Sequence, residues 1–156
     1  MKRTRLVFLC VVMLGVSSGM LSIHSPLFAT EEDQFHVIVH HSNTRSEITQ
    51  EELSNMFLKK ISRWKRSNEL IHPVDLQEDS AIRETFSKMI HGRKVTSIKA
   101  YWQRQIFSGR EIPPPEKEND RDILEFVSQE AGAIGYVSAS VDIHEYDVKL
   151  ITVIEE

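Results

Sequence analysis

Segments typical of strands alternate along this chain with segments typical of helices. The β-branched run 35–41 has the length and near-continuous apolar character of a covered strand. Further strands are expected over 70–75, 132–137 and 149–154, and helical periodicity fills the intervals between them. Because strands separated by helices need crossover connections, the pattern predicts an α/β fold with a mixed or parallel sheet flanked by helices.

Residues suited to capping helices mark where three of these helices should begin. Thr49 precedes Glu52 at the spacing of a capping box, and Ser80 and Asn119 stand before the next apolar periodic runs. A further helix is expected over about 95–107. The inward faces of these elements should bring large side chains together against the sheet, namely Phe57, Phe86, Trp102, Phe126 and Tyr136, with Met89 and Ile106 also facing inward.

The first 29 residues have the order of a secretory signal peptide. Three basic residues within Met1–Arg5 precede an apolar run over 6–15, and the small residue Ala29 precedes the expected cleavage site. The alternative is a retained membrane anchor, but the apolar run is much shorter than the roughly 20 residues that a spanning helix needs. We therefore expect one domain over residues 30–156, a periplasmic or secreted location, and no stable membrane span after cleavage.

Composition restricts how the exported domain is stabilised and what it binds. The only cysteine, Cys10, lies in the expected signal, so the domain should hold together through an ordinary apolar core without disulfides. Residues 30–156 contain 16 Lys and Arg against 23 Asp and Glu, a net charge of −7. Because nucleic-acid binding requires clustered cations, this balance argues against a nucleic-acid partner.

Neither a catalytic motif nor a metal-ligand motif is present. The sequence has no G-x-S-x-G elbow, H-E-x-x-H pair or phosphate-binding loop, so we expect no enzyme activity, no catalytic residue and no cofactor. His36, His40, His41 and His72 are candidate metal ligands. Since the adjacent His40 and His41 point to opposite faces of a strand, the prediction is that these histidines are solvated or hydrogen-bonded and hold no metal.

Three segments, in order, resemble the phosphate-specific periplasmic substrate-binding proteins of ABC transporters, in the type 2 periplasmic binding protein superfamily. These segments are Met56–Trp64 (MFLKKISRW), Pro73–Phe86 (PVDLQEDSAIRETF) and Asp122–Val137 (DILEFVSQEAGAIGYV). The resemblance covers residues 35 to 138. Family members are about twice as long and bind phosphate between two lobes, so the resemblance implies a single lobe.

The resemblance also implies where a ligand would bind. In the family an R-x-D-G-S-G-T turn holds the anion at a helix N-terminus, and here Ser80 matches while Leu76 stands at the Arg position. The implied ligand-binding residues are Ser80 with the backbone of Ala81 and Ile82, and Arg83, which could reach back to replace the lost charge. The alternative is that Ser80 only caps its own helix.

Two functions follow from the resemblance. The first is an exported solute-binding-type domain that binds phosphate or another small anion in connection with ABC-type transport. The second is a ligand-free adaptor that uses the same fold to bind another protein of the cell envelope. The basic run 59–66 is either a contact surface for an acidic partner or lipid head groups, or a solvated connector whose Trp64 is buried against the sheet.

Overall fold

A four-stranded mixed sheet forms the centre of the protein in the computed structural model, which describes residues 34–155. The strand order is β3-β6-β1-β7. The central pair, β1 (Phe35–His40) and β6 (Ala133–Ser138), is antiparallel. At the edges, β7 (Val148–Leu150) runs antiparallel to β1, and β3 (His72–Pro73) runs parallel to β6. The predicted mixed α/β fold is therefore confirmed.

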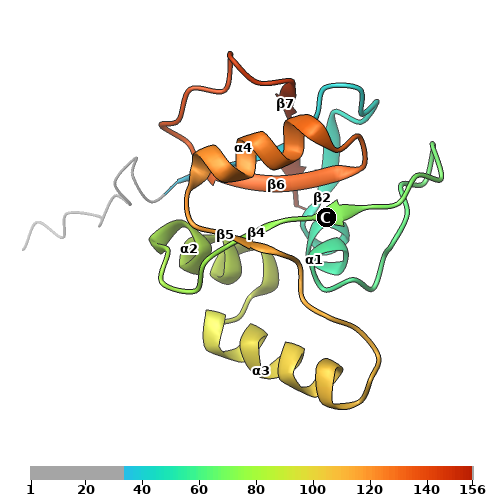
Figure 1. Cartoon of the computed structure of the whole chain (residues 1–156), viewed down its shortest axis with the longest axis vertical. Helices are drawn as coiled ribbons and strands as arrows, with labels where there is room; N and C mark the ends of the chain where they lie inside the picture. Colours follow the sequence, from blue (N-terminus) through green and yellow to red (C-terminus); the bar gives the residue numbers. More distant parts are fainter. Residues whose placement is uncertain (1–33, 156) are drawn as a thin grey trace, which may run out of the picture.

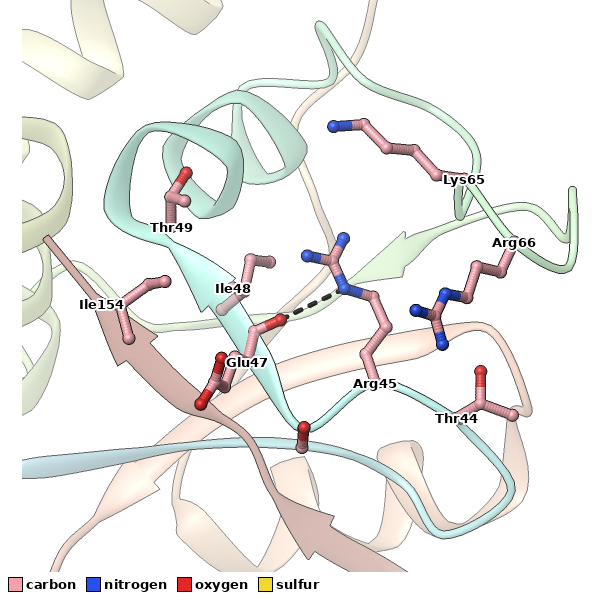
Figure 2. Close-up of a pocket in the computed structure, with 9 residues that line it drawn as sticks. Thr44, Arg45, Glu47, Ile48, Thr49, Lys65, Arg66 and Ile154 are labelled. Carbon is pink, nitrogen blue, oxygen red and sulfur yellow. Dashed lines mark hydrogen bonds between the residues drawn. The ribbon is translucent and has the colours of Figure 1, made fainter. Parts of the chain in front are cut away.

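Two small parallel sheets lie beside the central one. β2 (Glu47–Thr49) pairs with β8 (Thr152–Ile154), and Figure 2 shows Ile154 next to β2. β4 (Asp75–Leu76) pairs with β5 (Glu116–Lys117). The strands expected over 70–75 and 149–154 are each divided between two sheets, because the chain changes partners at Val74 and Ile151. There the Val74 N–H donates to Ile134 O, and the Ile151 N–H donates to Val37 O.

Four helices cover this framework: α1 (Gln50–Phe57), α2 (Ala81–His91), α3 (Val95–Phe107) and α4 (Asp120–Gln129). The predicted caps are confirmed, because the side chains of Thr49, Ser80 and Asn119 each accept a hydrogen bond from an N–H in the first turn of α1, α2 and α4. α2 ends at Gly92, which adopts the left-handed conformation (φ 61°) that favours glycine.

Successive residues of β6 face different helices, which places α4 on one side of the sheet and α1 with α2 on the other (Figure 1). A Cβ on Gly135 would lie 2.9 Å from the Ile123 side chain of α4. This helix therefore packs directly on the backbone of β6. The next residue, Tyr136, instead stacks on Phe86 of α2. α3 lies furthest from the central sheet, beyond α1 and α2.

An aromatic cluster fills the space between the sheet and α1 and α2. The rings of Phe86 and Tyr136 stack with their centroids 3.9 Å apart, and Phe57 lies 4.8 Å from Phe86. All three side chains are fully buried, and Phe126 is partly buried against the same core. The predicted clustering is confirmed for Phe57, Phe86 and Tyr136, whereas Phe126 packs against the core from α4, on the opposite side of the sheet.

The prediction for Trp102 was wrong, as was the inward placement of Met89 and Ile106. Trp102 is buried in a separate small cluster with Leu58 and Ile98, because α3 packs on the end of α1 and on α2 and not on the sheet. Met89 is 58% exposed and Ile106 is 50% exposed. Helical periodicity identified a shared apolar side, but that side is wider than the surface that the neighbouring elements cover.

Trp64 connects the segment after α1 to the start of β6 through a hydrogen bond. Both segments are among those that resemble the phosphate-specific binding proteins. Its ring is 3% exposed, and its Nε1–H donates to the carbonyl of Gly132 at 3.1 Å. A side chain at position 132 would collide with the Leu70 carbonyl, so glycine is required there. The predicted burial of Trp64 is confirmed, and this part of the basic run is anchored in the fold.

Candidate functional site

The turn between β4 and α2 carries all four residues that the resemblance implies as ligand contacts. Ser80 is the N-cap of α2, and its Oγ accepts a hydrogen bond from the Arg83 N–H at 3.3 Å. The N–H groups of Ala81 and Ile82 occupy the first two helical positions, which have no carbonyl partner within a helix. Ala81 is exposed at the surface, whereas Ile82 is nearly buried. These backbone groups are donors that an anion could use.

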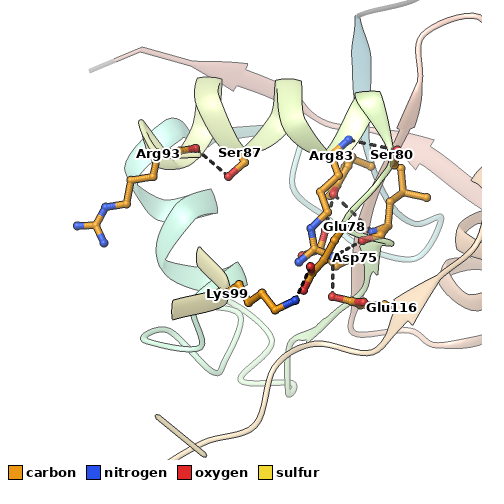
Figure 3. A network of polar contacts seen from close by, with 10 residues as sticks. Asp75, Glu78, Ser80, Arg83, Ser87, Arg93, Lys99 and Glu116 are labelled. Carbon is orange, nitrogen blue, oxygen red and sulfur yellow. Dashed lines mark hydrogen bonds and ion pairs between the residues drawn. The ribbon is translucent and has the colours of Figure 1, made fainter. Parts of the chain in front are cut away.

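The Arg83 side chain does reach back toward position 76, but its charge is engaged inside the protein (Figure 3). The residue is 5% exposed. Its Nη2 lies 3.1 Å from Asp75 Oδ2, its Nη1 lies 2.7 Å from Glu116 Oε1, and Nη1 also donates to the Leu76 carbonyl. Two carboxylates therefore share the one guanidinium, and an external anion would have to compete with both.

Asp75 is the buried member of this cluster. Its Oδ1 accepts hydrogen bonds from the Tyr136 hydroxyl and from the Leu76 N–H, the latter at 3.0 Å. Burial raises the pKa of Asp75 to about 6, although the Arg83 charge and the Tyr136 hydroxyl oppose the increase. Burial likewise raises the pKa of Tyr136 well above its ordinary value, so the phenol remains a proton donor to the carboxylate.

The exposed rim of the turn adds further negative charge. Glu78 pairs with Lys99 of α3, with Nζ and Oε2 2.8 Å apart, and Asp79 is exposed beside the cap. Together with Asp75 and Glu116, four carboxylates surround the turn, whereas the cations around it are Arg83 and Lys99. Figure 3 shows Glu78 beside Lys99, and Asp75 and Glu116 beside Arg83. An anion at the N-terminus of α2 would meet favourable N–H groups within an unfavourable local field.

The sequence-predicted site residues thus lie together on one helical turn, but the two polar side chains among them, those of Ser80 and Arg83, have partners within the fold. Sequence reasoning missed the residues that engage Arg83, namely Asp75, Glu116 and Tyr136. Asp75 lies at the end of the expected strand 70–75, between the apolar residues Val74 and Leu76, which could have marked it as a partner for a cation. Glu116 had no comparable signal because it lies in a charged surface segment.

The part of the chain that the structure describes contains no group of three or more His, Cys, Asp or Glu side chains able to hold a metal ion. His40 instead makes a local contact, with its Nδ1 2.7 Å from the hydroxyl of Ser42. Within residues 34–155, none of the helices combines the length and the apolar character needed to cross a membrane.

Comparison with known proteins identifies similar folds among transport proteins. A phosphate ABC transporter substrate-binding protein from Clostridium perfringens, solved with bound phosphate, superposes with a TM-score of 0.59 and 21% identity over 76% of this chain and 44% of its own. An ABC-type phosphate transport receptor from Vibrio cholerae gives a TM-score of 0.58 and 20% identity over 76% of this chain and 45% of its own. The chain thus spans less than half the length of these structures.

A search of curated proteins found no significant match. The model of one protein family, described as the PBP superfamily domain, matches residues 32–155, which include all the residues that the structure describes. The structural similarity agrees with this match, since the fold of this chain superposes on 44% and 45% of these two structures. The protein therefore belongs to the family described as the PBP superfamily domain.

Proposed function

We propose that this protein binds a small oxyanion such as phosphate at the N-terminus of α2 and catalyses no reaction. The observation that carries the proposal is the pair of N–H groups on Ala81 and Ile82, at the helix start where the resemblance places phosphate donors. The Clostridium perfringens relative, which was solved with phosphate, supports this ligand class. Ser80 contributes by fixing the first turn in the conformation that presents these donors.

The binding should be weak because the site offers dipoles without a free cation. Arg83 is shared by Asp75 and Glu116, and the rim carboxylates of Glu78 and Asp79 repel an anion. We expect a Kd of about 0.1–1 mM, which corresponds to roughly 4–5 kcal/mol of binding free energy. A partner that covered the turn and excluded water would strengthen the same contacts.

Calorimetric titration with phosphate, with sulfate as the second anion, tests this proposal. Ala81→Pro removes one N–H donor at the first helical position, where proline is well tolerated, and Ser80 already has the extended backbone that precedes a proline (φ −69°, ψ 127°). Val95→Pro at the same position of α3 is the matched control. At the helix start itself, followed through the amide signals of Ser80 and Ile82 in ¹⁵N-labelled protein, we expect phosphate binding to be lost in the first variant and kept in the second. Equal shifts of these signals in both variants, or no shift in the parent, would exclude the site.

A second candidate function, binding to another envelope protein, rests on the exposed end of α3. Phe107 is 89% exposed, and Ile106 and Ile112 nearby are 50% and 67% exposed. The surrounding segment 93–112 contains five basic residues and one acidic residue in a domain whose net charge is −7. Exposed aromatic and aliphatic side chains beside arginines are typical of protein interfaces, and here they favour an acidic partner.

Site-specific photocrosslinking in cells tests the adaptor function. A crosslinker placed at Phe107 should give one discrete protein adduct, whereas a crosslinker at Thr96, an exposed position near the other end of α3, should not. Charge removal by Arg104→Gln and Arg110→Gln should weaken the adduct. The absence of a discrete adduct at Phe107, or equal adducts at both positions, would argue against this function.

Export is also a proposal, because residues 1–33 lie outside the described part of the chain. It rests on the charged start, the short apolar run and Ala29 before the expected cleavage site. N-terminal sequencing of the protein from the periplasmic or extracellular fraction should give a start at Thr30. Recovery of intact Met1 in the membrane fraction would overturn it.

A further inference from the structure

A pocket bordered by cations lies beside α1, apart from the turn between β4 and α2, which we call the α2 turn. Its walls are the segment 44–49, the residues Lys65 and Arg66, and Ile154 near the C-terminal end (Figure 2). The hollow has a volume of about 360 Å³, which is within the range of small-molecule sites. We call it the β2 pocket, because β2 forms one of its walls.

Three cations border the β2 pocket although the domain as a whole is acidic. Arg45 comes from the segment before β2, and Lys65 and Arg66 come from the loop after α1, so the fold brings together two segments that are separate in the sequence. The carboxylates here are those of Glu47, which lines the pocket, and Glu52, which pairs with Arg45. The pocket therefore has a local excess of positive charge, whereas carboxylates outnumber cations around the α2 turn.

The fold holds Arg45 in a fixed position. Its Nη1 and Nη2 donate to the two carboxylate oxygens of Glu52 at 2.6 and 2.8 Å, and its Nε donates to the Glu47 carbonyl at 3.2 Å. Glu52 is 8% exposed, and its bond to Arg45 lowers its pKa. A guanidinium has five N–H groups, so one on each Nη remains for a ligand. Arg45 is thus a preorganised donor that needs no rearrangement on binding.

Glu52 forms its shortest ion pair with Arg45, so the excess positive charge of the pocket comes from Lys65 and Arg66. Lys65 Nζ lies 3.6 Å from Glu52 Oε1, and its side chain is 74% exposed, so it can turn toward a bound group. Within the described residues, no hydrogen bond or ion pair engages the Arg66 side chain, which lies near Thr44 in Figure 2. The hydroxyls of Thr44 and Ser46, two of the residues in the wall, add neutral donors.

From this arrangement we infer that the β2 pocket binds a small organic anion that carries a phosphate group. The oxyanion would lie among Arg45, Lys65 and Arg66, whose fork-shaped and rotatable donors suit such groups. Ile154, which is 39% exposed, offers an apolar wall to the organic part. This site is independent of the α2 turn and would operate whether or not phosphate binds there.

Calorimetric titration with glycerol 3-phosphate, inorganic phosphate and glycerol tests the inference and separates the contributions of the anion and the organic part. The double variant Lys65→Gln/Arg66→Gln should weaken glycerol 3-phosphate binding by about tenfold or more, because it removes two charged donors. Lys88→Gln/Arg121→Gln removes two exposed charges elsewhere and should leave binding unchanged. Glycerol alone should not bind.

Ala81→Pro distinguishes this pocket from the α2 turn, because it should leave glycerol 3-phosphate binding at the β2 pocket unchanged while phosphate binding at the turn is lost. In ¹⁵N-labelled protein, the amide signals of residues 44–49 should shift on titration, and those of the α2 turn should not shift in the Ala81→Pro variant. Equal weakening by both charge-removing double variants, or no binding of either phosphate compound at millimolar concentration, would overturn the inference.

Discussion

The ion pairs of Arg83 with Asp75 and Glu116, which we call the Arg83 cluster, give the most direct prediction about the turn between β4 and α2. Replacing Arg83 with Gln should lower the free energy of unfolding by about 3–5 kcal/mol, the usual loss when one partner of a buried ion pair is removed. The loss comes mainly from Asp75, which is 7% exposed and would be left without its cation. Glu116 contributes less, because its side chain is 39% exposed and water screens its charge.

The individual contributions can be separated by further variants. Glu116→Gln should cost no more than about 1 kcal/mol, as expected for a partly exposed pair. Asp75→Asn combined with Arg83→Gln should be less destabilised than the sum of the two single changes, because the double variant contains no unpaired buried charge. The difference defines a coupling free energy, which we expect to be about 1–3 kcal/mol.

Urea unfolding at pH 7, followed by circular dichroism and by the fluorescence of the buried Trp64 and Trp102, measures these free energies. The unfolding slope should be the same in all variants, so that a change in midpoint reports stability alone. A loss below about 1 kcal/mol for Arg83→Gln would refute the reasoning. It would show that the Arg83 charge is not used within the fold and remains available to a ligand.

Two further predictions concern the core beside this turn. Phe86→Ala should lower the free energy of unfolding, measured in urea, by about 3–5 kcal/mol, because Phe86 is 1% exposed and stacks on Tyr136. A loss below about 1 kcal/mol would contradict this packing. Burial lowers the pKa of His91 from 6.5 to about 4, so its stabilising contribution is present above pH 6.5 and about 3 kcal/mol is lost as the pH falls to 4. His91→Gln should therefore lose less stability than the parent between pH 6.5 and pH 4. Parallel losses in the two proteins would assign the pH dependence to other groups. The raised pKa of Asp75 stabilises the folded state as the pH falls, but this effect is the same in both proteins.

Local signals explain why much of the fold could be predicted from the sequence. The caps at Thr49, Ser80 and Asn119 depend on side chains that bond within three residues, so sequence spacing is sufficient to find them. Trp102 shows the limit of this reasoning. Helical periodicity shows which side chains share a face, but the surface that the face contacts depends on where α3 packs in the folded chain.

From the sequence, only the backbone part of the candidate site could be predicted. The start of α2 and its N–H donors follow from Ser80, whereas the partners of Arg83 follow from the pairing of β4 with β5, two-residue strands that are far apart in the sequence. Strands this short leave no periodic pattern. The β2 pocket was missed for a related reason, because Arg45 and Lys65 meet at Glu52 only in the folded chain, and Ile154 reaches the pocket through the pairing of β8 with β2.

The energies of the Arg83 cluster limit what an anion at the α2 turn can gain. Phosphate bound at about 0.1–1 mM contributes roughly 4–5 kcal/mol, whereas withdrawing Arg83 from Asp75 would cost about 3–5 kcal/mol. Most of the binding free energy would therefore be consumed if the guanidinium moved to the ligand. An anion at this turn must rely on the backbone of Ala81 and Ile82, with Arg83 left in place. Arg45 in the β2 pocket differs, because it keeps its bonds to Glu52 and still has N–H groups for a ligand.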